Sequence, residues 1–320
     1  MGIRVGFVGC GSIHARHAEC LAAMPEVVIA GHYDIDGTRA EAAAERFGGK
    51  AYGSPAALCD SAKAEAVFVC VPPNGHGEAE DSLLDRRAHL FVEQPLARDA
   101  ATAKSIAQGL RARKLIGAAG CQWRYLDTVQ KARDALKGQC ISLARGWWHG
   151  GMPEQEWWKQ WDASGGQFFE QATHVTDLLR YLCGEVREVF ALGSRGCLPE
   201  RRDYTIFDST AVSMSFKSGA VGVISATCVK ACGSTAGVEL ITPDRLVRID
   251  DGVLTVREAG KVTTYTPSVD PFVEQSRAFV DAVMTGKKTR VRAPYADAVK
   301  TLQVGLAVNE AIGSGMATRP

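Results

Sequence analysis

The residues with the most evident capacity for chemistry lie in the segment GGQFFEQATHVTDLLRYL, residues 165–182. It places an acid, a histidine and a second acid, Glu170, His174 and Asp177, at spacings of four and three. If the segment is one helix, the three side chains lie on one face. Such a trio suits a proton-transfer site, a metal site, or only the polar start of an ordinary helix. The rest of the chain has to decide among these.

The whole chain has the character of a soluble globular protein of about two domains, at 320 residues with 46% hydrophobic and 23% charged residues. Its formal net charge of +1 gives no electrostatic reason to expect nucleic acid or an anionic membrane as a partner. The N-terminus runs straight into a strand-like stretch without a signal-peptide pattern, so we expect a cytoplasmic protein. Its ten cysteines are scattered without a C-x-x-C pair, which favours reduced, mostly buried thiols.

The first third of the chain alternates short apolar runs with longer helical patterns. Near-continuous Val, Ile and Phe runs between helices are typical of strands buried on both faces, and they predict a doubly wound parallel sheet. We expect this Rossmann domain to span residues 1–121. The runs cover residues 3–9, 27–34, 66–73, 89–95 and 115–122.

A glycine-rich turn, GCGSIH at residues 9–14, follows the first of these strands. It matches G-x-G-x-x-G except that His14 fills the third slot. The two glycines permit a tight turn and a close approach of the backbone to a pyrophosphate at a helix N-terminus. Asp34, at the end of the second strand, is placed to accept both hydroxyls of an adenosine ribose and to repel a 2′-phosphate. NAD is therefore the expected cofactor, while Arg39 keeps NADP as an alternative.

The pattern changes after residue 121, and we assign residues 122–320 to a second, α+β domain. Two apolar strands flank a hairpin turn at residues 217–219, and further short strands alternate with turns up to residue 266. These predict a mostly antiparallel sheet. Helices are expected near residues 173–183, 272–285 and 295–313.

Six tryptophans lie between residues 123 and 161, five of them in GWWHGGMPEQEWWKQW. Packing is the usual role of aromatic side chains, but flat faces with a polar edge also suit pyranose rings. We expect the loop at 153–166 to cover a substrate. The predicted substrate contacts are Trp157, Trp158, Arg124 and His149.

Four stretches in the right order bring a family into view: GCGSIHARH (9–17), VCVPPNGHGE (69–78), FVEQPLA (91–97) and GGQFFEQATHVTDLLRYLCGE (165–185). Together they resemble the Gfo/Idh/MocA family of nicotinamide-dependent sugar and cyclitol oxidoreductases. The resemblance implies a Rossmann domain followed by a domain with a large open sheet, which often serves as an oligomer interface. It thus implies a homodimer or homotetramer, and metal-free chemistry.

The chain departs from the family pattern at two sites. Where the family usually has E-K-P, the chain has Glu93-Gln94-Pro95, and Gln94 carries neither a charge nor a usable proton. Where the family has D-x-G-x-H-x-x-D, Glu170 replaces the first Asp and Ala172 the Gly, while His174 and Asp177 remain. The resemblance therefore implies a site that keeps its acid–base histidine and loses its cation.

These observations predict an NAD-dependent dehydrogenase or reductase that acts on a sugar, sugar derivative or cyclitol. A histidine with a near-neutral pKa suits removal of the hydroxyl proton, so His174 is the candidate base. Two alternatives stay open: glycoside cleavage through transient oxidation and elimination, and a non-catalytic nucleotide-sensing regulator. The catalytic candidates are His174, Glu170 and Gln94. The cofactor is expected to contact Gly9, Gly11, Ser12, Ile13, Asp34, Arg39, Pro72 and Glu93.

Overall fold

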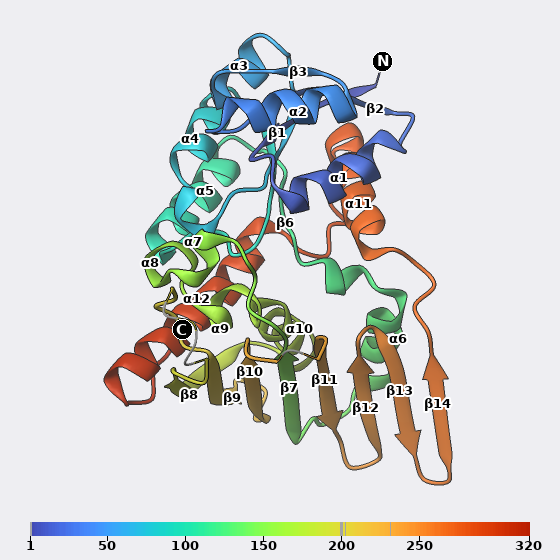
Figure 1. The fold of residues 1–320 in the computed structure, drawn as a ribbon. Coiled ribbons are helices and arrows are strands. Elements are labelled where there is room, and N and C mark those ends of the chain that lie inside the picture. The colour runs from blue at the N-terminus through green and yellow to red at the C-terminus, as the bar shows by residue number, and fades with distance from the viewer. Residues whose placement is uncertain (1, 199–200, 202, 231) are drawn as a thin grey trace. The chain divides into compact units, whose positions relative to one another are not determined.

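The computed structural model describes residues 2–198, 201, 203–230 and 232–320. The chain divides into two compact units (Figure 1). Unit 1 comprises Met1–Gln122 and Asp270–Val299, and unit 2 comprises Trp123–Val269 and Lys300–Pro320. Among the described residues, no helix combines the length and the apolar character that a membrane span requires.

Unit 1 contains a six-stranded parallel sheet with strand order β3-β2-β1-β4-β5-β6. The predicted parallel sheet is thereby confirmed. The order reverses between β1 and β4, and a ligand of such a sheet binds at the carboxyl ends of the strands beside that reversal. The strands are β1 (Ile3–Val8), β2 (Val27–Tyr33), β3 (Lys50–Ala51), β4 (Ala66–Val69), β5 (His89–Val92) and β6 (Gly117–Ala119).

Helices connect these strands, and their starts follow the capping rules. The side chains of Asp36, Ser54 and Asp99 each accept a hydrogen bond from a backbone N–H in the first turn of α2, α3 and α5 respectively. The helices are α1 (Ser12–Ala22), α2 (Gly37–Phe47), α3 (Pro55–Asp60), the 3₁₀ turn η1 (Pro73–Gly75), α4 (Glu78–Asp85) and α5 (Ala100–Ala112).

A late segment of the chain returns to unit 1. Helix α11 (Pro271–Thr285) packs beside α1, and its Phe279 and Val280 belong to the core beneath β1 and β4. Arg16 forms an ion pair with Asp270, and the guanidinium of Arg277 lies 3.1 Å from Glu26. Residues 270–299 therefore belong to unit 1, whereas the sequence-based division placed all of residues 122–320 in the second domain.

Unit 2 is built on an eight-stranded sheet with strand order β14-β13-β12-β11-β7-β10-β9-β8. All neighbours are antiparallel except β7 and β10, which run parallel. The hairpin of β9 and β10 was predicted, whereas the edge strand β8 was not. The strands are β7 (Leu143–His149), β8 (Val186–Ser194), β9 (Ser209–Phe216), β10 (Val221–Thr227), β11 (Thr235–Ile241), β12 (Arg245–Asp250), β13 (Val253–Glu258) and β14 (Lys261–Tyr265).

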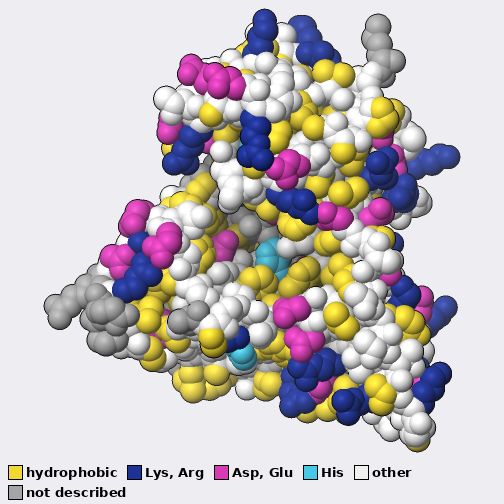
Figure 2. Space-filling view, turned by 45° about the vertical axis from the view of Figure 1, so that its right-hand side comes forward, with side chains coloured by type: hydrophobic (Ala, Val, Ile, Leu, Met, Phe, Trp, Pro, Cys, Tyr) yellow, Lys and Arg dark blue, Asp and Glu magenta, His cyan; other side chains and the backbone are white. Residues whose placement is uncertain are grey.

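Side chains from helices cover one face of this sheet and form the core of unit 2, with Val175, Leu178 and Val308 fully buried. The opposite face leaves Leu192 and Val221 more than half exposed, and Figure 2 shows hydrophobic side chains gathered there, along the lower edge of the view. The helical elements are η2 (Gln122–Tyr125), α6 (Asp127–Leu136), α7 (Glu156–Lys159), α8 (Trp161–Ser164), α9 (Gln167–Glu170), α10 (Thr173–Cys183) and α12 (Tyr295–Ser314).

Candidate functional site

The glycine-rich turn between β1 and α1 has the geometry of an anion-binding loop. Gly9 has a φ of +83°, and a Cβ there would lie 2.4 Å from the carbonyl oxygen of Cys70, so only glycine fits. Gly11 caps α1 without any side-chain hydrogen bond to the helix, and the first turn holds no acidic residue. The N–H groups of Ser12 and Ile13 therefore begin a helix whose own first turn carries no carboxylate.

Asp34 stands beside this turn and is held by two backbone N–H groups. Its Oδ2 accepts a hydrogen bond from Cys10 N at 2.7 Å, and its Oδ1 accepts one from Asp36 N at 2.9 Å. Each oxygen keeps a second lone pair for a ribose hydroxyl. Arg39 lies on the exposed side, where its Nε is 3.4 Å from Asp36 Oδ2.

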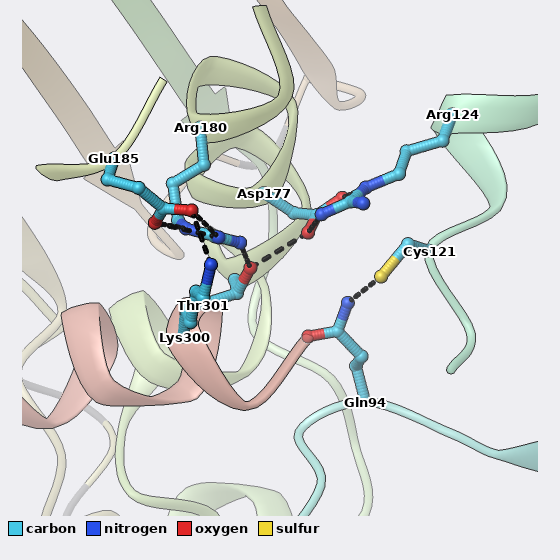
Figure 3. Close-up of polar contacts among 8 residues, drawn as sticks. All are labelled: Gln94, Cys121, Arg124, Asp177, Arg180, Glu185, Lys300 and Thr301. Carbon is cyan, nitrogen blue, oxygen red and sulfur yellow. Dashed lines mark hydrogen bonds and ion pairs between the residues drawn. The ribbon is translucent and has the colours of Figure 1, made fainter. Parts of the chain in front are cut away.

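Gln94 and Glu93, after β5, are fixed within unit 1. Glu93 Oε1 lies 2.5 Å from His17 Nε2, and Glu93 Oε2 accepts a hydrogen bond from Gln94 N at 3.1 Å. The Gln94 side-chain amide donates to Cys121 Sγ at 2.6 Å (Figure 3). Gln94 therefore presents an oriented amide where the family pattern has a lysine. Pro72, half-buried, precedes η1 at the end of β4.

In unit 2, the acid–histidine segment is not one helix. Helix α9 ends at Glu170 and α10 begins at Thr173, with a turn at Gln171 and Ala172 between them. The condition under which all three polar side chains would share one helical face is therefore not met, because the helical register is interrupted between Glu170 and His174. Only His174 and Asp177 belong to the same regular helix.

His174 lies half-buried on α10 among tryptophan rings. Its imidazole centroid is 5.6 Å from that of Trp148 on β7 and 6.2 Å from that of Trp123 in η2. The two indoles are themselves stacked at 5.9 Å. Neither Trp123 nor Trp148 was among the site residues predicted from the sequence.

Glu170 is tied to a second tryptophan. Trp158 is 2% exposed, and its Nε1 donates a hydrogen bond to Glu170 Oε2 at 2.5 Å. Burial raises the pKa of Glu170 from 4.5 to about 7, and the hydrogen bond from Trp158 opposes part of that rise. A carboxyl group that titrates near neutral pH can both accept and return a proton. The sequence predicted Trp158 as a substrate contact and missed this bond, while Trp157 beside it is half-buried.

Asp177 belongs to a buried ionic network (Figure 3). Arg124 donates to both of its oxygens, at 2.8 and 2.7 Å, and both side chains are 3% exposed. Thr301 donates to the same carboxylate at 2.8 Å and accepts from Arg180 at 2.7 Å. The guanidinium of Arg124 thus holds α10 through Asp177, and a contact of Arg124 with substrate stays a prediction.

His149 lies on the other face of the sheet from His174. Successive side chains of β7 alternate between the faces, so Trp148 turns to α10 while His149 turns away. The imidazole Nε2 of His149 lies 2.9 Å from Ser225 Oγ, in a shallow pocket of about 360 Å³ on the helix-free face. The strand pleat thus points the ring of His149 away from His174, and a contact of His149 with substrate stays a prediction.

The parallel sheet, the glycine turn and Asp34 define unit 1 as a dinucleotide-binding Rossmann domain, coupled in one chain to a unit with a buried acid and a half-buried histidine. Family models agree with this class. A model described as an oxidoreductase family with an NAD-binding Rossmann fold matches residues 3–120, and the GFO/IDH/MocA C-terminal domain matches residues 137–244. The chain belongs to the Gfo/Idh/MocA family, and unit 1 contains its NAD-binding domain.

Curated relatives and solved structures are consistent with that family. The chain is 27% identical over 305 residues to myo-inositol 2-dehydrogenase of Thermotoga maritima, covering 90% of each protein. It is 24% identical over 265 residues to levoglucosan dehydrogenase of Pseudarthrobacter phenanthrenivorans, covering 70% of this chain and 67% of that protein. A levoglucosan dehydrogenase solved with NADH has the same fold, with a TM-score of 0.90 at 20% identity over 100% of this chain and 99% of that one.

Proposed function

We propose that the protein is an NAD-dependent dehydrogenase or reductase that acts on a secondary alcohol or ketone of a sugar, sugar derivative or cyclitol. The observation that carries the proposal is a half-buried histidine on α10, packed against Trp123 and Trp148, together with a buried acid at the end of the preceding helix whose pKa is about 7. Relatives named for inositol and levoglucosan support a polyhydroxylated ring as substrate.

The residues of unit 1 account for binding of the cofactor. The N–H groups of the first turn of α1 receive the pyrophosphate, and Asp34 accepts the ribose hydroxyls. Its charge disfavours a 2′-phosphate, which supports NAD over NADP. Ile35 is 95% exposed directly after Asp34 and offers an apolar surface to the adenine ring, a contact that the sequence did not suggest.

Residues of unit 2 account for transfer of the hydroxyl proton. The bound cofactor supplies the hydride acceptor or donor. His174 takes the hydroxyl proton as the carbinol is oxidised and returns it in the reverse direction. Glu170 stabilises the imidazolium or holds a neighbouring hydroxyl, with Trp158 fixing its carboxylate. Trp157 is the loop residue we assign to the substrate, and Gln94 orients a substrate oxygen by hydrogen bonding without supplying charge.

Cofactor binding and turnover test this proposal separately. Titration with NADH and NADPH, followed by energy transfer from tryptophan to the nicotinamide, is expected to show tighter binding of NADH. A panel of cyclitols, pyranoses and glycosides is then incubated with NAD⁺. Formation of NADH supports the dehydrogenase. Release of an aglycone without net formation of NADH would instead identify glycoside cleavage by oxidation and elimination, the alternative that Gln94 in place of the family's lysine keeps open. Absence of binding of either nucleotide overturns the proposal.

A further inference from the structure

Three ligand-type side chains of unit 1 converge beneath the glycine turn, and cofactor binding gives them no role. They are the thiol of Cys10 in the turn, the imidazole of His14 on α1 and the imidazole of His32 on β2. The Cys10 Sγ and one nitrogen of each ring lie within 4.8 Å of one another. Among the described residues, no other group of three or more such side chains meets so closely.

The two histidines are oriented by their surroundings. His14 Nε2 lies 3.0 Å from His32 Nδ1, and His32 Nε2 lies 2.9 Å from the carbonyl oxygen of Gly48. Phe7 packs edge-on against His14 at 4.6 Å and stacks on His32 at 5.5 Å between centroids. Both rings are buried, and they occupy fixed positions on two different elements.

The hydrogen bond to Gly48 determines the tautomer of His32. A carbonyl oxygen only accepts, so Nε2 of His32 carries the proton and Nδ1 presents a lone pair toward His14 and Cys10. Ligating histidines in metal sites usually donate their second ring N–H in this way to a backbone carbonyl or a carboxylate. Burial lowers the pKa of His14 to about 3, so its ring is neutral at pH 7 and keeps a lone pair for coordination.

We propose that Cys10, His14 and His32 form a binding site for a thiophilic divalent cation such as Zn²⁺. One sulfur and two imidazole nitrogens are a ligand set that zinc accepts in tetrahedral geometry, with the fourth position left to water. The exposed Gly11, whose Cβ position has no atom within 4 Å, leaves the turn open to solvent on the Cys10 side. The site would connect the turn that receives the pyrophosphate to the strand that leads to Asp34.

Binding has a defined proton balance. The cation replaces the thiol proton of Cys10, which is released to solvent. The proton on His14 Nε2, shared with His32 in the empty site, moves to Nδ1 of the same ring as Nε2 becomes a ligand. Burial and the neighbouring Asp34 raise the pKa of Cys10 to about 12, so deprotonation of the thiol opposes coordination and weakens it as the pH falls.

Titration of the full-length, cofactor-free protein with Co²⁺, as a spectroscopic substitute for Zn²⁺, tests the site directly. The expected result is a sulfur-to-cobalt charge-transfer band together with the visible bands of tetrahedral Co²⁺, both abolished by Zn²⁺. Calorimetry with Zn²⁺ in buffers of different ionisation enthalpy is expected to show release of one proton per cation.

Matched variants locate the site. Cys10→Ala and His32→Phe are expected to remove the charge-transfer band and to weaken Zn²⁺ binding by more than about 10-fold. His32→Phe keeps an aromatic ring against Phe7, and thermal melting reports whether each variant is folded. Cys140→Ala, which removes an exposed thiol elsewhere in the chain, is expected to retain the band. Absence of the band in the native protein, or its survival in Cys10→Ala, overturns the proposal. Neither result depends on nucleotide binding or turnover.

Discussion

Replacing Trp158 with phenylalanine is expected to change the pH dependence of the reaction. The indole N–H donates to Glu170, and phenylalanine keeps an aromatic ring in the buried cluster with Tyr204, Ile206 and Cys228 but donates nothing. The hydrogen bond stabilises the carboxylate form, so its loss raises the pKa of Glu170 further. The direction of the change follows from the chemistry of the bond alone.

The size of the change follows from the strength of a charge-assisted hydrogen bond. Such bonds contribute about 1.5–3 kcal/mol, and a pKa difference of one corresponds to about 1.4 kcal/mol. Starting from a pKa of about 7 for Glu170, the variant is expected to titrate at about pH 8–9. If the carboxylate form is the active one in alcohol oxidation, the acidic limb of the pH profile moves upward by the same amount.

The assay is kcat/KM for alcohol oxidation against pH, which reports the ionisations of the free enzyme. Trp157→Phe is the matched control, because it changes the neighbouring indole and should leave the position of the limb unchanged. Glu170→Gln should remove the limb altogether. The reasoning is refuted if the limb stays in place in Trp158→Phe, or if Trp157→Phe moves it equally.

Three further predictions concern stability and cofactor choice. Glu170→Gln should raise the free energy of unfolding by about 3 kcal/mol above pH 7, because the pKa of Glu170 is about 7 in the folded protein and 4.5 in the unfolded chain. Urea titrations should show this gain at pH 8 and no gain at pH 4.5. An equal gain at both pH values would contradict the prediction. Arg124→Met should lower the free energy of unfolding by about 3–5 kcal/mol, because it leaves Asp177 buried without its cation. The double variant Arg124→Met/Asp177→Leu should recover part of this loss. Equal stability of the single and double variants in urea titrations would argue against the network. Asp34→Ala should weaken NADH binding by about 10- to 100-fold, measured by fluorescence titration, while NADPH binding weakens less; equal loss for both nucleotides would show that Asp34 does not select the cofactor.

Local sequence patterns predicted the architecture of both units well. Apolar runs predicted the buried strands of unit 1, and turn residues predicted the hairpin of β9 and β10. The return of α11 to unit 1 has no local signal, because it rests on contacts such as Arg277 with Glu26 that join distant parts of the chain. The edge strand β8 was missed although its sequence alternates as a strand should.

The candidate site was predicted in residue type more than in geometry. Motif spacing drew attention to Glu170 and His174, and a helix was predicted near residues 173–183, but the short helix α9 and the turn that separates it from α10 were not predicted. The contacts of the other candidate residues depend on the direction in which each side chain points. Arg124 turned to Asp177, and the pleat of β7 carried His149 to the opposite face, neither of which composition or spacing could reveal.

The most direct test of the central claim is the initial rate of NADH formation from NAD⁺ with the polyol panel, compared between the native protein and His174→Ala. The native protein is expected to oxidise at least one cyclitol or pyranose. The variant is expected to lose about 10²- to 10⁴-fold in kcat while its affinity for NADH is unchanged. Native-like turnover by His174→Ala would contradict the role of His174 as the acid–base group.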